Sequence, residues 1–118
     1  MPKILVLDDQ TDILYLMETV LRLHGYEVQT AFSKDKFYEL LSSFKPQLVI
    51  LDVMIGGDDG RDICREIKAA EHKHIPVILY SANPDLLLDF QECHANDVLE
   101  KPFAIKDLLS KIEKSFNS

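Results

Sequence analysis

Short apolar runs alternate along the chain with longer stretches in which apolar residues recur at helical spacing. The short runs are rich in β-branched residues and leucine and predict buried strands. The longer stretches carry apolar residues three or four positions apart, which predicts amphipathic helices. This alternation predicts an α/β fold with three layers, a five-stranded parallel sheet between helices. The expected strands are residues 3–8, 27–31, 48–52, 75–80 and 98–101, and the expected helices are residues 11–24, 33–43, 61–70, 83–94 and 105–116.

Individual residues mark where helices begin and end. Gly25 supplies a left-handed stop after the first helix, and Ser33 is a side-chain cap for the second. Asn83 followed by Pro84 has the order expected at the start of a helix. Residues 56–60 contain three glycines and predict a mobile loop without regular structure.

Helical spacing also predicts which side chains of two helices are buried. In helix 11–24, Leu16 is expected on the buried face and Tyr15 outside it. In helix 83–94, Phe90 and Cys93 are expected in the core, whereas Leu88 falls on the far side. Because single exposed leucines are ordinary on protein surfaces, Leu88 is interpreted as an exposed residue without an assigned role.

Length and charge limit the kinds of protein that the chain can be. Its 118 residues fit one domain, residues 1–118, and leave no room for a second catalytic domain. Lys and Arg number 13 against 20 Asp and Glu, and the net charge of −7 disfavours direct binding to nucleic acid or anionic lipid. No apolar run is long enough to span a membrane. With only two cysteines, both expected as reduced thiols, the predicted location is the cytoplasm.

Polar residues whose side chains can bind ligands or react stand at the carboxyl ends of four predicted strands. Asp8 and Asp9 end the first strand, Asp52 the third, Ser81 the fourth and Lys101 the fifth. In an open parallel sheet all these ends face one edge, where ligands bind. Three carboxylates, a hydroxyl and an ammonium are therefore predicted to converge on one site.

Such a site suits a divalent cation and a phosphoryl group. Clustered carboxylates repel one another unless a cation lies among them, and hard oxygen ligands favour Mg2+ or Mn2+. Lys101 would then neutralise oxygens of a phosphoryl group in transfer. A carboxylate can itself be the nucleophile, and Asp52 is the best candidate because Asp8 and Asp9 form an adjacent, metal-holding pair.

This set resembles the receiver domain of two-component response regulators. The resemblance rests on Asp8-Asp9, Asp52, Ser81-Ala82 and Lys101-Pro102-Phe103, and it covers the whole chain. Asp52 follows Asp9 by 43 positions, Ser81 follows Asp52 by 29, and Lys101 follows Ser81 by 20. The resemblance implies a flavodoxin-like, doubly wound sheet with strand order 2-1-3-4-5.

It also implies a role for each matching residue. Asp52 would accept phosphate from a phosphohistidine on a sensor histidine kinase or histidine phosphotransfer protein. Asp9 would bind Mg2+ directly, Asp8 largely through water, and Asp52 and the backbone carbonyl of Met54 would complete the protein ligands. The protein would catalyse only its own phosphorylation and hydrolysis, without acting as an enzyme on an outside substrate.

The remaining family roles concern the switch. Lys101 and Ser81 would each bond a phosphoryl oxygen, and Ala82 would leave space for the Ser81 hydroxyl to move. Pro102 would follow a cis peptide that aims Lys101 into the site. A downstream protein would bind the face made by the fourth helix, fifth strand and fifth helix, and the domain itself would be a monomer or weak dimer. It would be either a stand-alone regulator or a piece of a longer regulator or hybrid kinase.

The chain departs from the family pattern at two positions. Receivers often carry Tyr or Phe three residues before the lysine, whereas this chain has Val98, so a readout by ring rotation is not expected there. Receivers also often have proline four residues after the acceptor aspartate, whereas this chain has Gly56 followed by Gly57. A looser loop is therefore expected after Asp52.

Three other interpretations compete with this one. An aspartate-nucleophile phosphatase tends to carry a second acid two residues after the nucleophile, where this chain has Met54. A receiver-like module that binds proteins without being phosphorylated is disfavoured by the complete set of acids, hydroxyl and lysine. A zinc site at Cys64, His72 and His74 lacks a fourth ligand and matches no common spacing.

Overall fold

A five-stranded parallel sheet forms the centre of the protein, in a computed structural model that describes residues 1–117. The strand order is β2-β1-β3-β6-β7, which is the predicted order 2-1-3-4-5 with two small extra strands counted between the third and fourth. The fold is therefore the expected doubly wound, flavodoxin-like one. The strands of this sheet are β1 (Lys3–Leu7), β2 (Glu27–Ala31), β3 (Leu48–Asp52), β6 (Val77–Ser81) and β7 (Asp97–Glu100).

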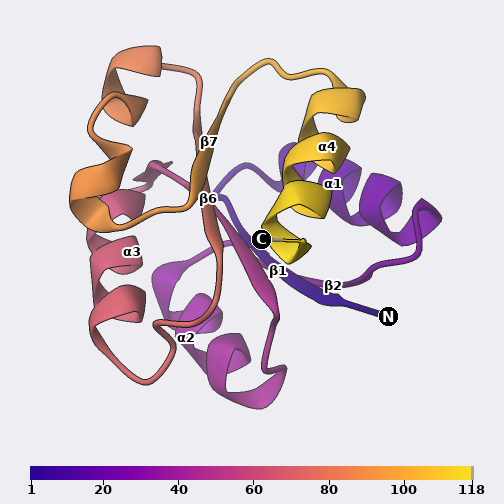
Figure 1. Ribbon diagram of the computed structural model, residues 1–118, viewed down its shortest axis with the longest axis horizontal. Helices are drawn as coiled ribbons and strands as arrows, with labels where there is room; N and C mark the ends of the chain where they lie inside the picture. The colour runs from indigo at the N-terminus through magenta and orange to yellow at the C-terminus, as the bar shows by residue number, and fades with distance from the viewer. Residues whose placement is uncertain (118) are drawn as a thin grey trace.

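Helices cover both faces of the sheet. In Figure 1, α1 and α4 lie on one side, and α2, α3 and the orange segment that follows β6 lie on the other. This is the three-layer arrangement that the alternation predicts, with helix boundaries within two residues of the expected ones. The helices are α1 (Thr11–Leu23), α2 (Lys34–Ser43), α3 (Gly60–Ala69) and α4 (Ile105–Phe116).

The sheet separates two apolar cores, and β3 supplies both. Leu48 and Ile50 pack with α1 and α4, whereas Val49 and Leu51 pack with α2 and α3. All five residues of β3 are buried, because a central parallel strand has helices on both faces. Continuous apolar runs, without alternation of polar residues, are the sequence pattern of such strands.

The prediction that residues 56–60 form a loop without regular structure is wrong. Two short strands, β4 (Met54–Ile55) and β5 (Asp58–Asp59), pair antiparallel and form a hairpin around Gly56 and Gly57. Gly56 has a φ of 57°, a left-handed conformation that glycine adopts readily. The glycines therefore serve the turn of a hairpin, which their number alone did not reveal.

The continuous helix predicted over residues 83–94 is also wrong. The segment instead forms two 3-10 helices, η1 (Pro84–Leu87) and η2 (Phe90–Cys93). Leu87 and Cys93 are buried and Phe90 is half-buried between them. Their spacing is compatible with an α-helix as well, and packing against the core selects two short 3-10 helices instead. Leu88 is exposed, as predicted.

The buried face of α1 is rotated from the predicted one. Leu14, Met17 and Leu21 are buried, whereas Leu16 is 43% exposed. Tyr15 is exposed, as predicted. The helix carries two overlapping leucine stripes, and the spacing does not distinguish the one that the sheet covers.

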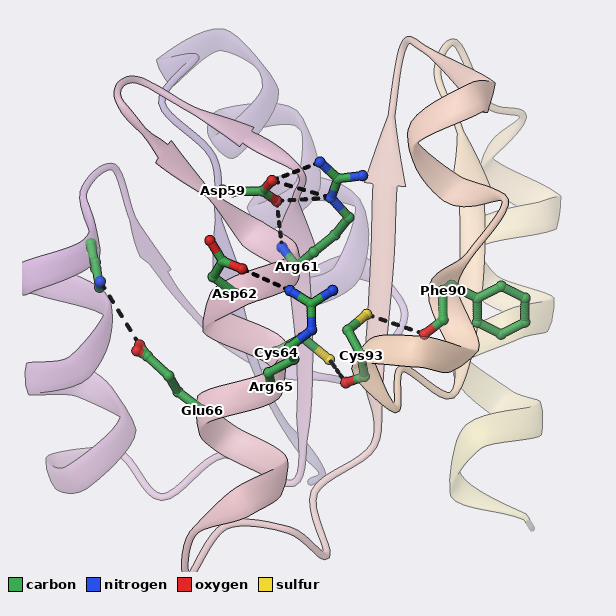
Figure 2. A network of polar contacts seen from close by, with 9 residues as sticks. Asp59, Arg61, Asp62, Cys64, Arg65, Glu66, Phe90 and Cys93 are labelled. Carbon is green, nitrogen blue, oxygen red and sulfur yellow. Dashed lines mark hydrogen bonds and ion pairs between the residues drawn. The ribbon is translucent and has the colours of Figure 1, made fainter.

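Two free cysteines join α3 to η2 (Figure 2). Both are buried, and the Cys64 thiol donates to the backbone carbonyl of Cys93 at 3.2 Å. Burial raises the pKa of the Cys64 thiol to about 12, and the neighbouring Cys93 adds to the effect. Cys64 is therefore a protonated packing residue, in agreement with the expected reduced thiols.

A membrane span was not expected, and the helices described over residues 1–117 agree with that expectation. None of them combines the length and the apolar character that crossing a bilayer requires.

Candidate functional site

The carboxyl ends of four strands bring the predicted site residues to one edge of the sheet. Asp8 directly follows β1, Asp52 is the last residue of β3, Ser81 is the last residue of β6, and Lys101 directly follows β7. Because all four strands are parallel and adjacent in the sheet, these ends lie side by side. The edge strand β2 contributes none of the predicted residues.

Lys101 links two buried carboxylates. Its Nζ lies 3.0 Å from Asp8 Oδ2 and 3.0 Å from Asp52 Oδ2. The Asp8 side chain is fully buried, and those of Asp52 and Lys101 are 8% and 12% exposed. Charges this far from water need partners, and one ammonium between two carboxylates leaves negative charge uncompensated. The site is therefore prepared for a further cation.

The three aspartates fit a divalent cation. Asp8, Asp9 and Asp52 each offer a carboxylate oxygen, and these oxygens lie within 4.8 Å of one another. Hard oxygen donors are the ligands that Mg2+ and Mn2+ favour. Asp9 is exposed, so water can complete a coordination shell. The donor set thus fits the predicted ion.

Burial changes the acidity of Asp52. Desolvation raises the pKa of Asp52 above that of an ordinary aspartate, and the nearby charge of Asp8 raises it further. The hydrogen bond from Lys101 opposes both effects. A bound cation would stabilise the charged form of Asp52 and so offset the cost of its burial.

The loop after β3 holds the acids through backbone amides. The Met54 amide donates to Asp52 Oδ1 at 3.1 Å, and the Gly56 amide donates to Asp9 Oδ2 at 2.9 Å. Met54 therefore has its backbone beside Asp52, and the ligand role of its carbonyl stays a prediction. The hairpin is less loose than its two glycines suggest, because one of them is bonded to a site carboxylate.

Gly60 lets the chain close tightly behind Asp52. Its amide donates to the Val53 carbonyl at 2.7 Å. A Cβ at this position would lie 2.0 Å from the Asp52 carbonyl oxygen, a distance that no side chain tolerates. Glycine is thus required here by close approach of two backbone segments.

Ser81 and Lys101 are connected through the backbone. The Lys101 amide donates to the Ser81 carbonyl at 2.8 Å, which continues the β6–β7 pairing by one residue. The Ser81 hydroxyl is buried and accepts from the Asn83 amide at 3.1 Å, whereas the neighbouring Ala82 is exposed. The Lys101–Pro102 peptide is cis, as expected.

Val98 lies on β7, half-buried against the α2 and α3 side of the core. Val98 and the half-buried ring of Phe103 line a surface cavity of about 540 Å3 between β7 and α4. Position 98 thus borders open space and carries no ring, and its role in switching stays a prediction.

Tyr80 is a site residue that sequence reasoning missed. Its hydroxyl donates to Asp8 Oδ2, and Lys101 Nζ lies 4.3 Å from the centre of its ring. The available signal was strand alternation. Tyr80 stands two positions after Ile78, as Asp52 stands two after Ile50, so their side chains point to the same face of the sheet. A tyrosine in an otherwise aliphatic buried strand also needs a partner for its hydroxyl.

The zinc interpretation finds no support in the part of the chain that the structure describes. Cys64 is buried against Cys93, and His72 pairs with Glu71 at 3.5 Å. Over residues 1–117, the aspartate trio is the group of three or more potential ligands close enough to share an ion.

A family model agrees with this site. The model of the response regulator receiver domain matches residues 4–113. The chain belongs to this family. Its membership is consistent with two-component signalling, in which receiver domains interact with histidine kinases or phosphotransfer proteins.

Solved structures of similar proteins support the same fold. A candidate response regulator from Chloroflexus aurantiacus J-10-fl is 27% identical over 100% of both chains, with a TM-score of 0.92. The receiver domain of NtrX from Brucella abortus is 33% identical over 98% of both chains, with a TM-score of 0.90. In a structure of NtrX from the same organism in complex with ADP, the match covers 99% of this chain and 27% of that one, at 33% identity and a TM-score of 0.91. The chemotaxis protein CheY4 from Vibrio cholerae, 23% identical over 98% of both chains with a TM-score of 0.89, shows the likeness of fold alone.

Proposed function

We propose that this receiver domain is a Mg2+-dependent phosphorylation switch whose acceptor is Asp52. The phosphoryl group comes from a phosphohistidine on a sensor histidine kinase or a histidine phosphotransfer protein. The observation that carries the proposal is the position of Lys101, whose ammonium lies 3.0 Å from the Asp52 carboxylate in a site that also holds Asp8 and Asp9.

Asp52 and Lys101 would perform the transfer itself. A carboxylate oxygen of Asp52 forms the new bond to phosphorus while the bond from phosphorus to the donor imidazole breaks. Lys101 and Ser81 then bond oxygens of the transferred group, drawing on the ammonium already at Asp52 and on a buried hydroxyl one strand away. Asp8, Asp9, Asp52 and the Met54 carbonyl would hold the cation, which supplies positive charge beside the phosphoryl oxygens.

The output would be a protein contact. A phosphoryl group on Asp52 would shift a pre-existing equilibrium at the face made by η1, η2, β7 and α4, where a downstream protein binds. The domain would act in the cytoplasm and catalyse only its own phosphorylation and dephosphorylation. Its net charge of −7 supports protein partners over nucleic acid.

The test compares wild type with Asp52→Asn, with Asp58→Asn as a matched control. Asp58 is an exposed acid on β5 of the adjacent hairpin, so its substitution removes the same charge from the same region without touching the acceptor. After incubation with Mg2+ and phosphoramidate, acid-stable and base-labile label is expected on wild type and Asp58→Asn and is expected to be absent from Asp52→Asn.

The other results decide against the proposal. Equal labelling of Asp52→Asn and wild type would show that another residue is the acceptor. Steady turnover of phosphate esters that Asp52→Asn abolishes would favour a phosphatase. No binding of Mg2+ at millimolar concentration would favour a module that acts through protein contacts alone.

A further inference from the structure

The carboxylate of Asp8 has a complete set of donors from the protein. Its Oδ1 accepts from the Gln10 amide at 2.9 Å, and its Oδ2 accepts from both Lys101 and the Tyr80 hydroxyl. Because Asp8 is fully buried, bulk water does not replace a donor that leaves, so a replacement has to come from the protein or from the shell of the proposed ion. In the resting site Lys101 alone would satisfy Asp8 Oδ2. The need to satisfy Asp8 in that state therefore does not explain why the Tyr80 hydroxyl also donates to the same oxygen.

Lys101 is the donor that has to leave. In the resting site its ammonium is shared between Asp8 Oδ2 and Asp52 Oδ2, at 3.0 Å each. A phosphoryl group on Asp52 offers new oxygens beyond that carboxylate, and an ammonium that follows them weakens its bond to Asp8. A buried carboxylate oxygen left without any donor carries a large desolvation penalty, which would hold Lys101 back.

The geometry of Tyr80 removes that penalty. Its hydroxyl donates to the same oxygen of Asp8 that Lys101 would release. Tyr80 is itself fully buried in β6, so its position does not depend on Lys101. Its ring lies 4.3 Å from Lys101 Nζ, and a cation–π contact at this distance attracts the ammonium while leaving its hydrogen-bond partners open to exchange.

We propose, resting on the function proposed above, that Tyr80 is a positioning residue that keeps Asp8 bonded and so frees Lys101 to follow the phosphoryl group. The ring holds the ammonium over the site, and the hydroxyl replaces the contact that Lys101 gives up. Tyr80 acts through Asp8 and Lys101 and does not touch the phosphoryl group itself. A residue that merely fills the core would need the ring and not the hydroxyl.

Tyr80→Phe separates the hydroxyl from the ring. The matched control is Tyr38→Phe, because the Tyr38 hydroxyl donates to Glu66 at 2.7 Å and bridges α2 and α3 away from the acids. With phosphoramidate and saturating Mg2+, Tyr80→Phe is expected to be phosphorylated about tenfold more slowly than wild type, the size of effect that a hydrogen bond to a charged group has. Tyr38→Phe is expected to react at the wild-type rate.

Two measurements distinguish this role from a structural one. The dissociation constant for Mg2+ without phosphodonor is expected to stay within about twofold in Tyr80→Phe, because Lys101 still satisfies Asp8 in that state. In metal-free wild type, NMR is expected to show a slowly exchanging tyrosine hydroxyl proton that disappears in Tyr80→Phe and remains in Tyr38→Phe.

Three results would overturn the proposal. These are phosphorylation of Tyr80→Phe at the wild-type rate, a loss of Mg2+ affinity as large as the loss of rate, and absence of the Tyr80 hydroxyl signal from wild type. A wild-type protein that takes no label at all is a different failure, because it contradicts the proposed function on which this role rests.

Discussion

Two segments leave the sheet at the functional edge, after the neighbouring strands β3 and β6, and they are attached to the site in different ways. The hairpin after β3 is tied to the acids by backbone amides, those of Met54 on Asp52 and Gly56 on Asp9. The 3-10 segment after β6 reaches a neutral site group through one amide, that of Asn83 on the Ser81 hydroxyl, and is otherwise held by buried side chains such as Leu87 and Cys93. The hairpin therefore contacts the charges directly, whereas the 3-10 segment is coupled to them through packing.

The largest expected effect on stability comes from a substitution where the hairpin meets α3, behind Asp52. Gly60→Ala places a Cβ against the Asp52 carbonyl, and we expect it to lower the free energy of unfolding by about 3 kcal/mol, as overpacking does. Gly57→Ala is the control, since no atom lies within 4 Å of its Cβ position, and its effect should stay within about 0.5 kcal/mol. Urea denaturation measures both. Equal stability of the two variants would contradict the close approach.

An intermediate effect tests whether packing holds the 3-10 segment. Leu87 is 6% exposed and Leu88 is 73% exposed, although they are adjacent in sequence. Leu87→Ala is expected to cost about 2–3 kcal/mol of unfolding free energy, because it leaves a cavity in the core. Leu88→Ala should change it by less than about 0.5 kcal/mol. Similar losses from both substitutions would show that the segment does not have this register.

The smallest expected effect concerns the junction of the hairpin with α3. Asp59 caps α3 by accepting from the Arg61 amide at 2.8 Å, and it also pairs with the Arg61 side chain (Figure 2). Asp59→Ala should cost about 1 kcal/mol, whereas Asp59→Asn, which keeps a capping oxygen, should cost less. Thermal unfolding measures both.

The pH dependence of this junction has a definite sign. Hydrogen bonding from Arg61 lowers the pKa of Asp59 in the folded protein. The ion pair therefore contributes stability above the unfolded pKa of about 3.9, and that contribution is lost as the pH falls through the lower folded value. The stability difference between wild type and Asp59→Asn should shrink from pH 7 to pH 3. A difference that grows on acidification would contradict the pairing.

The sequence predicts the fold well where burial dominates. The apolar runs that end in Asp8, Asp52 and Ser81 are strands because helices bury such short runs on both faces of a parallel sheet, and parallel pairing then brings their ends together. The convergence of these residues was thus predictable from strand ends alone. The order of the strands came from the family resemblance and not from the apolar pattern.

Prediction failed where distant contacts decide between similar local structures. The spacing of Leu87, Phe90 and Cys93 is compatible with both an α-helix and a 3-10 helix, and packing against the core selects the second. The partner of Tyr80 lies 72 positions away in the chain, so no local pattern indicates that its hydroxyl reaches Asp8.

Because β3 sends alternate side chains into both apolar cores and ends at Asp52, this residue lies between two separately packed layers. From this position, packed contacts lead in two directions. One leads past the 3-10 turns, and the other leads through Tyr80 to Phe103, whose rings meet edge to face at 6.3 Å. Phe103 and the 3-10 segment belong to different cores, so a substitution at Phe103 would leave the packing of the 3-10 segment in place.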